Sequence, residues 1–434
     1  MSQTKTTLPS FATALRFWVK LGFLSFGGPA GQIAMMHREL VEERRWIDHR
    51  RFMDGLNFCM LLPGPEAMQL ATYLGWRMHS TKGGIAAGAM FVIPSALILF
   101  ALAWLAMTGA GLAWLDAMFL GLMAAVIAIV GQAIWRIGKR ALTTPALWCI
   151  ACAAFLAIFA VNLSFVWIIL TAGLLGAFGN RFFPAMFPQG GGHGDDHAGA
   201  TAAGESLDAI PAASWRGASK VTLTCLLLWA APLAAVALWL GWQSVPAQQG
   251  VFFSKAAMVT FGGAYAVLPY VAQQAVESHG WLSHPQMMTG LALAESTPGP
   301  LIMVLQFVGF VGAWQNPGDL TPLAAASVGA SITTWVTFLP CFWFIFLGGP
   351  YVERLGDMPR VSAALTSLTA AVVGLILNLA VKFTHHAIWP DPETMRWQIA
   401  LLAVVTFIAL TRFRIGLIPV IATCAVLGAA GLLG

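Results

Sequence analysis

The sequence contains very few charged residues. Asp, Glu, Lys and Arg make up 9% of its 434 residues, whereas they account for about a quarter of an ordinary soluble domain. Hydrophobic residues reach 58%, and the mean hydropathy is +0.76. A soluble protein cannot hide so much apolar surface, because much of any folded surface must face water. The composition therefore excludes a cytosolic enzyme, a nucleic-acid-binding protein and a disulfide-rich secreted domain, and it predicts a protein surrounded by membrane lipid.

The motifs that would indicate catalysis or ATP hydrolysis are also missing. There is no GxxxxGK[ST] loop, no HExxH and no Ser/His/Asp arrangement. The six cysteines lie in apolar runs, and Cys149-x-x-Cys152 has no nearby Cys or His partner, which favours ordinary helix packing. The polar stretch Met1–Ser10 predicts no cleavable signal peptide. We therefore expect no catalytic residue, metal or cofactor, and an ion gradient or the substrate's own gradient as the energy source.

Long apolar runs predict an all-α integral membrane protein. Spanning a bilayer takes about 20 apolar residues, and the runs of that length are Gly83–Ala106, Asp116–Trp135, Val221–Trp242, Leu323–Leu347, Ala363–Val381 and Ile415–Leu433. The stretch Pro188–Ser214 is rich in Gly, Ala, Asp and His, which is typical of a linker. We divide the chain into a first membrane repeat at 1–181, a cytoplasmic linker at 182–219 and a second membrane repeat at 220–434.

The two membrane segments repeat each other. When Phe26 is aligned with Phe261 and the spacing is kept constant, Phe26-Gly27-Gly28 falls on Phe261-Gly262-Gly263 and Pro63-Gly64-Pro65 falls on Pro298-Gly299-Pro300. We call this correspondence the repeat alignment. From Phe26 to Pro65 it has no gap, and about one position in three is identical. Two related halves are typical of secondary transporters.

The basic residues predict that the halves have inverted topology. The segment His37–Asp54 carries five arginines, whereas its repeat partner, Ala272–Thr289, has no Lys or Arg. Lys and Arg concentrate in cytoplasmic loops, so equivalent loops of the two halves should lie on opposite faces of the membrane. This layout places the N-terminus and the linker in the cytoplasm and the C-terminus outside.

Four apolar segments are interrupted by Gly and Pro. Phe52–Trp76 is broken at Pro63-Gly64-Pro65 and has basic flanks on both sides, which favours a re-entrant hairpin on the cytoplasmic face. Phe11–Leu40 has the same pattern, and Val251–Gln274 and Gln286–Gly312 would enter from outside. A kinked full span is the alternative interpretation, because irregular backbone at membrane depth needs protein or a cavity around it.

The breaks are also the candidate substrate site. Proline removes an N–H group and glycine tolerates any φ, so a helix must stop there, and the helix that follows exposes free N–H groups suited to an anion. The candidate substrate-binding residues are the turns, two matched hydroxyls beside them and two matched lysines: Ser25, Gly27, Gly28, Pro29, Pro63, Gly64, Pro65, Thr260, Gly262, Gly263, Pro298, Gly299, Pro300, Lys20 and Lys255. A simple packing kink, and lysines that reach the membrane surface, are the structural alternatives.

Two carboxylates lie deep in these broken segments. Glu66 follows Pro65, and Glu295 precedes Pro298 by three residues. A carboxylate at membrane depth is costly unless it is paired or protonated, so both are candidates for coupling or counter-charge. For Glu66, a helix N-terminal acid is an equally good interpretation. Gln69 and Gln306 are weaker polar candidates.

The sequence resembles the chromate ion transporter family. The residues that carry the resemblance are FLSFGGPAGQIAMMHRELVEERRWID and LLPGPEAMQLATYLGW in the first half, and MVTFGGAYAVLPYV and WLSHPQMMTGLALAESTPGPLIMVLQFVGF in the second. It covers the whole chain except the linker and extreme termini, and the length is similar to that of long-chain, two-domain members. The motif departs at Ala264, where the first half has Pro29.

The resemblance implies a multi-pass protein of the bacterial inner membrane that exports chromate, a sulfate-like oxyanion, and so confers chromate resistance. The driving force would be the membrane potential or a proton gradient. Its partners would be the oxyanion and membrane lipid, with a homodimer left open. A transporter of another anion, such as sulfate or an organic acid, remains an alternative, as does a lipid scramblase or membrane enzyme.

Overall fold

The computed structural model describes residues 8–187, 214–352, 359–390 and 395–431, and this part of the chain contains helices and turns but no strand. In residues 8–187 the helices are α1 (Phe11–Leu24), α2 (Gly28–His37), π-helical η1 (Arg38–Glu43), α3 (His49–Met60), α4 (Glu66–Thr108), α5 (Ala113–Ala141), α6 (Pro145–Val161) and α7 (Phe165–Phe182). The predicted all-α fold is confirmed. Most of the predicted linker lies outside the described residues.

Helices also make up most of residues 214–431. They are α8 (Trp215–Leu240), α9 (Val245–Val259), α10 (Ala264–Ala272), π-helical η2 (Gln273–Ser278), α11 (His284–Ser296), 3-10 helix η3 (Leu301–Met303), α12 (Val304–Gln315), α13 (Pro322–Gly348), 3-10 helix η4 (Gly349–Tyr351), α15 (Pro359–Ile388), α16 (Trp397–Thr411) and α17 (Leu417–Ala429).

Six helices of the described chain are long and apolar enough to cross a membrane. They are α4, α5, α7, α8, Pro322–Tyr351 and Val361–Ile388. The predicted run Ile415–Leu433 instead forms the 13-residue α17, while α7 reaches 18 residues. At a rise of about 1.5 Å per residue, α17 is too short to cross a hydrocarbon core of about 30 Å by itself.

The predicted helix breaks are confirmed at all four Gly/Pro turns. Around the first turn, α1 ends at Leu24 and α2 begins at Gly28, with left-handed φ angles at Gly27 and Gly28. The same change occurs between α3 and α4, between α9 and α10, and between α11 and η3. The helices that flank the turns at Gly27 and Gly262 have between 9 and 15 residues, so none of them can span a bilayer alone.

Helix α4 is a bent pair of helical arms. His79 and Ser80 have non-helical backbone angles, and the chain folds back there. A Cβ atom added to Gly75 would lie 2.5 Å from the carbonyl oxygen of Gly83. The two arms therefore pack backbone against backbone.

The repeat alignment relates local structure as well as sequence. The π-helical turn η1 recurs as η2, and the positive φ of Arg45 recurs at Gly280. Asp48 caps α3 as Ser283 caps α11, each side chain accepting a hydrogen bond from the N–H group three residues later. The same backbone path is thus built twice from largely different side chains.

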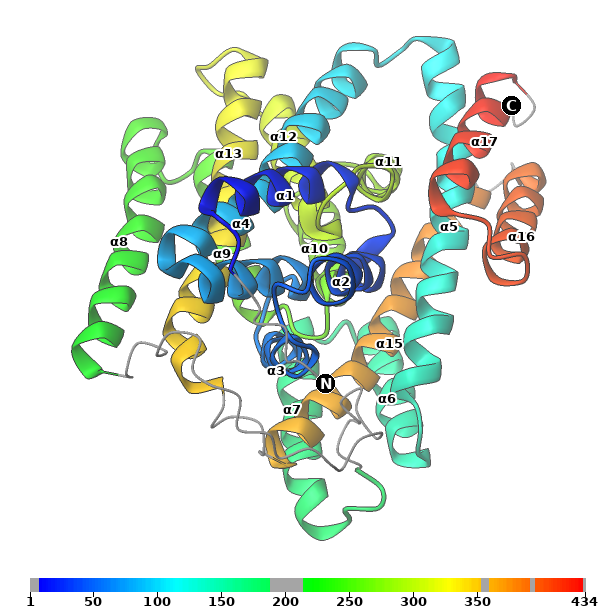
Figure 1. Ribbon diagram of the computed structural model, residues 1–434. Coiled ribbons are helices and arrows are strands. Elements are labelled where there is room, and N and C mark those ends of the chain that lie inside the picture. Colours follow the sequence, from blue (N-terminus) through cyan, green and yellow to red (C-terminus); the bar gives the residue numbers. More distant parts are fainter. Residues whose placement is uncertain (1–7, 188–213, 353–358, 391–394, 432–434) are drawn as a thin grey trace.

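The short helices beside the Phe-Gly-Gly turns lie in the middle of the molecule. In Figure 1, α8 stands on one flank, α16 and α17 stand on the opposite flank beside α5, and α1, α2, α9 and α10 lie between them. Helix α15 packs against α5, α6 and α7, and α13 packs against α9 and α12. The long helices therefore enclose the Gly/Pro turns.

Candidate functional site

The Gly/Pro turns of the two halves are hydrogen-bonded to each other. The Gly64 N–H donates to the carbonyl oxygen of Thr260 at 2.7 Å, and the Gly299 N–H donates to that of Ser25 at 3.0 Å. The repeat alignment relates Gly64 to Gly299 and Ser25 to Thr260. Each Pro-Gly-Pro turn thus binds the Phe-Gly-Gly turn of the other half, and we call this arrangement the turn junction.

Gln32 ties the junction together on one side only. Its Nε2 atom donates to the carbonyl oxygens of Ser25, at 3.0 Å, and Gly299, at 2.6 Å. The repeat alignment places Val267 at the equivalent position in the second half. The sequence did not single out Gln32, although its position one helical turn beyond the glycines is a signal that could have found it.

Two further glutamines donate to backbone carbonyl oxygens. Gln69 Nε2 donates to the carbonyl oxygen of Pro63 at 2.7 Å, and Gln306 Nε2 donates to that of Ala96 at 2.8 Å. The Pro63 carbonyl lies in the turn before α4, whereas the Ala96 carbonyl lies inside α4. Gln69 thus belongs to the turn junction, whereas Gln306 anchors α12 to α4.

The central glycines of the Pro-Gly-Pro turns have no room for a side chain. Gly64 has a φ of +122°, and an added Cβ would lie 2.9 Å from both Cys341 Sγ and Gln69 Nε2. Gly299 has a φ of +99°, and its added Cβ would lie 2.6 Å from Ser95 Cβ. By contrast, Cβ atoms on Gly27 and Gly28 would meet nothing within 4 Å. The Pro-Gly-Pro turns are packed, whereas the first Gly-Gly turn borders open space.

The structure distinguishes the two candidate carboxylates. Glu295 is 6% exposed and accepts a short hydrogen bond from the hydroxyl of Tyr265. Glu66 is the first residue of α4, and its Oε1 atom would lie 3.9 Å from a Cβ on Gly263. Glu66 therefore borders the glycine turn of the opposite half, while Glu295 bridges the two broken segments of its own half. Tyr265 was not predicted, because nothing in a sequence marks a partner that lies in another helix.

The two matched hydroxyls differ in their partners. Thr260 Oγ1 donates to the carbonyl oxygen of Ala256 at 2.6 Å, so its hydrogen is already used. Ser25 Oγ is buried and has no hydrogen-bond partner in the described residues, and the same holds for Ser95 Oγ beside Gly299. Buried donors without partners are rare in proteins. The junction therefore has hydrogen-bonding capacity left for a polar ligand or water.

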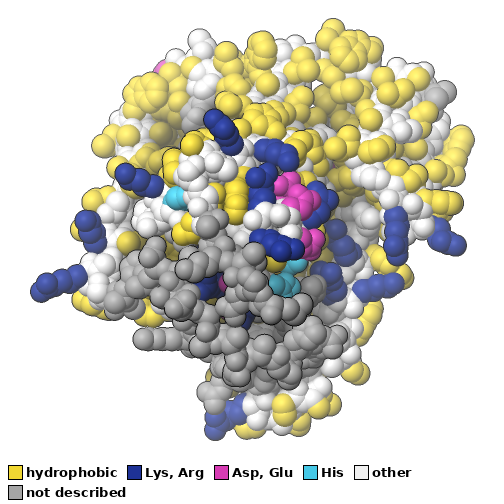
Figure 2. All heavy atoms as spheres, in the orientation of Figure 1, with side chains coloured by type: hydrophobic (Ala, Val, Ile, Leu, Met, Phe, Trp, Pro, Cys, Tyr) yellow, Lys and Arg dark blue, Asp and Glu magenta, His cyan; other side chains and the backbone are white. Residues whose placement is uncertain are grey.

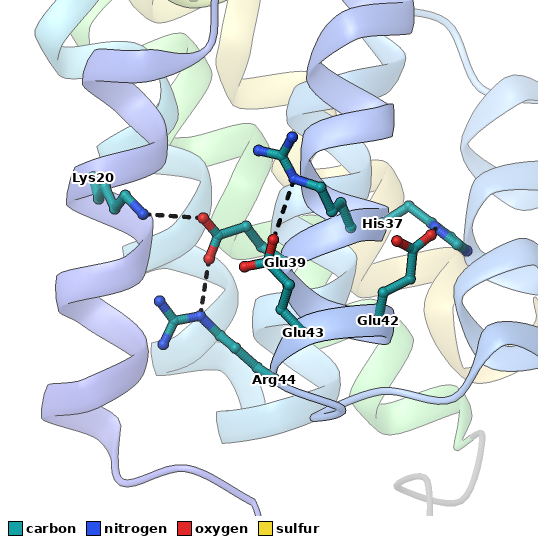
Figure 3. Close-up of polar contacts among 7 residues, drawn as sticks. Lys20, His37, Glu39, Glu42, Glu43 and Arg44 are labelled. Atoms are coloured by element: carbon teal, nitrogen blue, oxygen red, sulfur yellow. Dashed lines mark hydrogen bonds and ion pairs between the residues drawn. The ribbon is translucent and has the colours of Figure 1, made fainter.

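The two matched lysines lie outside the turn junction. Lys20 Nζ forms an ion pair with Glu39 Oε1 at 3.0 Å, and Arg44 Nε binds Glu39 Oε2 at 3.1 Å. Figure 3 shows Glu39 between these two cations. Lys255 is exposed and forms no ion pair with a described residue.

The polar residues around Glu39 form one surface group. His37 binds Glu42 at 3.0 Å, and Arg38 binds Glu43 at 3.4 Å. Figure 2 shows the acidic side chains of this face gathered beside Lys, Arg and His, with a hydrophobic surface above them. No three His, Cys, Asp or Glu side chains of the described segments come together as a metal site would require.

Comparison with known proteins identifies the family. Residues 12–177 and 247–429 match the family described as chromate transporter. The chain belongs to the chromate transporter family. It is 32% identical to the chromate transport protein of Cupriavidus metallidurans over 92% of this chain and 87% of that protein. It is 37% identical to that of Pseudomonas aeruginosa, over 83% and 77%.

A relative of lower identity aligns over a similar length. The probable chromate transport protein of Synechococcus elongatus is 29% identical, over 89% of this chain and 88% of the relative. No solved structure matches the chain.

Proposed function

We propose that this protein is a secondary active transporter that exports chromate from the cytoplasm and that the membrane potential or a proton gradient drives the export. Membership of the chromate transporter family supports the substrate. The names of the relatives from C. metallidurans and P. aeruginosa support it as well. The two related halves are the architecture that secondary transporters commonly use.

The observation that carries the proposal is the turn junction. It joins the two halves by reciprocal backbone hydrogen bonds at Gly64 and Gly299, and it leaves buried hydroxyls at Ser25 and Ser95 without partners among the described residues. Hydroxyl and amide donors bind oxyanions, and helix starts such as that of α4 add a favourable dipole. A tetrahedral dianion suits such donors. Chromate and sulfate share this shape and charge, so we expect the site to bind both.

The same junction suggests a route to alternating access. Each Pro-Gly-Pro turn is held by a carbonyl of the other half, so movement of one half against the other must break or remake these two bonds. Glu295 and Glu66 are the carboxylates beside the turns, and protonation of one of them would link proton movement to anion release. In this proposal the N-terminus is cytoplasmic.

Uptake of labelled chromate into everted membrane vesicles tests the proposal. Vesicles that contain the protein should accumulate chromate, a protonophore or potential collapse should stop the accumulation, and excess sulfate should inhibit it. Vesicles without the protein are the control. Equal uptake by both kinds of vesicle would reject the function.

A further inference from the structure

The two halves hold a nitrogen-containing side chain in the same aromatic cage. In the first half the guanidinium carbon of Arg44 lies 5.5 Å from the ring of Phe17 and 4.9 Å from that of Trp46. In the second half the ring of His279 lies 6.2 Å from that of Phe252 and 4.4 Å from that of Trp281. The repeat alignment relates each member of one cage to its counterpart in the other.

The backbone beneath the cages is also the same. The Arg44 N–H donates to the carbonyl oxygen of residue 39 at 3.0 Å, and the His279 N–H donates to that of residue 274 at 2.9 Å. The Trp46 N–H bonds to residue 40 at 2.9 Å, and the Trp281 N–H bonds to residue 275 at 2.8 Å. Side chains at equivalent positions in and just after η1 and η2 therefore start from equivalent backbone.

The halves differ in the carboxylate. Glu39 lies between Lys20 and Arg44 and binds both. The second half has Lys255 in place of Lys20 and His279 in place of Arg44, but Gln274 in place of Glu39. Two side chains that can carry positive charge are thus kept, while the anion between them is replaced by a neutral amide.

No acid in the described part of the chain makes up for this loss. The nearest carboxylate along the sequence, Glu277, forms an ion pair with Lys382 of α15 at 2.5 Å. Lys255 is exposed and forms no ion pair within the described segments, and Gln274 is partly exposed. Among the described residues, no carboxylate therefore pairs with Lys255 as Glu39 pairs with Lys20.

We propose that Lys255, Gln274 and His279 form a binding site for an oxyanion group, which occupies the place of the Glu39 carboxylate. Lys255 supplies a positive charge, and the His279 ring and the Gln274 amide supply N–H donors. The ligand chemistry is that of a sulfate-like free anion or of a lipid phosphate. The site lies away from the turn junction and does not depend on chromate transport.

Equilibrium binding of labelled sulfate to the purified full chain tests this site. Gln274→Glu gives the second half the built-in carboxylate of the first half, and it should remove about one bound sulfate per chain or weaken that binding at least about tenfold. His279→Arg should retain the binding, because Arg44 occupies this cage in the first half.

The matched control is the reciprocal change. Glu39→Gln removes the carboxylate between Lys20 and Arg44, and it should add about one sulfate per chain by the same argument. Lys255→Gln removes the charge without adding a carboxylate and should lose the same sulfate as Gln274→Glu. Circular dichroism and gel filtration show whether each variant is folded.

Nanodiscs of two lipid compositions show whether the bound group is a free anion or a lipid phosphate. Sulfate should bind in nanodiscs of phosphatidylcholine alone. If added phosphatidylglycerol displaces sulfate from the wild type, the phosphate of that lipid is the occupant. If sulfate stays bound, the free anion is the occupant. Sulfate binding that is unchanged by both Gln274→Glu and Lys255→Gln in folded protein would overturn the site. Such a result would not contradict chromate transport, which the vesicle uptake assay tests separately. The two proposals can therefore fail independently.

Discussion

The side chains of Glu295 and Tyr265 are hydrogen-bonded, and this single pair connects the two broken segments of the second half. The repeat alignment places Met60 and Ala30 at the equivalent positions of the first half, where no such bond can form. The pair is therefore an asymmetric feature of an otherwise repeated backbone. This asymmetry suits a residue with a task that one half performs alone, such as proton coupling.

Substitutions of Glu295 and of Tyr265 should have different effects on chromate uptake. Glu295→Gln cannot release a proton, so it should abolish the protonophore-sensitive part of the uptake. Tyr265→Phe keeps the ring but removes the donor, and the lost hydrogen bond should shift the pH profile of uptake and lower the rate about tenfold or more. Uptake in everted vesicles at several pH values measures both effects. If Tyr265→Phe lowered the rate without moving the profile, the tyrosine would have only a structural role.

His284 should make stability depend on pH at the other end of α11. Partial burial and the neighbouring His386, whose ring centroid is 3.8 Å away, lower the pKa of His284 to about 4, while Glu277 opposes the shift and Lys382 adds to it. The folded protein keeps this histidine neutral, whereas the unfolded chain binds a proton below its ordinary pKa of about 6.5. Its contribution is therefore present above that value and is lost as the pH falls toward 4.

Thermal unfolding followed by tryptophan fluorescence checks this expectation. The wild type should lose more stability between pH 7 and pH 5 than His284→Gln does, by about the amount that one histidine contributes. His385→Gln removes an exposed histidine from the adjoining part of α15 and is the control. Equal losses in wild type and His284→Gln would contradict the prediction.

Among the secondary-structure elements and their connections, we expect the two Pro-Gly-Pro turns to be the most sensitive to substitution. Gly64→Ala and Gly299→Ala should both destabilise the protein by roughly 2 kcal/mol or more, because a Cβ is strained at positive φ and also collides with packed atoms. Gly111→Ala is the matched control, since Gly111 has a φ of +89° but nothing within 4 Å of the added Cβ. It should show the backbone strain alone. Unfolding midpoints in detergent compare the three variants, and equal losses would mean that packing at the turns is unimportant.

The sequence predicts these elements well and their contacts poorly. Helix breaks at the glycines and prolines, and the first helical position of Glu66, follow from local backbone rules that need no knowledge of the fold. The hydrogen bond from Gln32 to Gly299 joins the two halves of the chain, and that from Tyr265 to Glu295 depends on how two helices pack. The sequence makes Lys20 a candidate for binding the substrate. Its ion-pair partner, Glu39, is apparent only from the packing of the helices.

The turn junction is shared by the two halves of the molecule, so neither half completes it. Chain 1–200 expressed alone lacks the donor of Gly299, and chain 201–434 lacks that of Gly64. We expect either piece alone to transport no chromate and the two pieces co-expressed to restore uptake. Co-purification through a tag on one piece, together with vesicle uptake, measures the result. Activity of a single piece would show that the junction is dispensable.

The glycine contacts between adjoining helical arms have a mechanical consequence. A Cβ on Gly309 would lie 2.8 Å from the carbonyl oxygen of Gly329, just as one on Gly75 would lie 2.5 Å from that of Gly83. Main chain, which has no rotamers to exchange, forms part of each contact beside the small side chains of Thr333 and Ala87, so the helices have little freedom to slide past each other. Each pair, α12 with α13 and the two arms of α4, is then a stiff bracket that starts just beyond a Pro-Gly-Pro turn. If either helix pair tilts as a rigid unit, the Pro-Gly-Pro turn at its end is displaced with it. The backbone amides where the two helices touch should be among the slowest in the protein to exchange with deuterium.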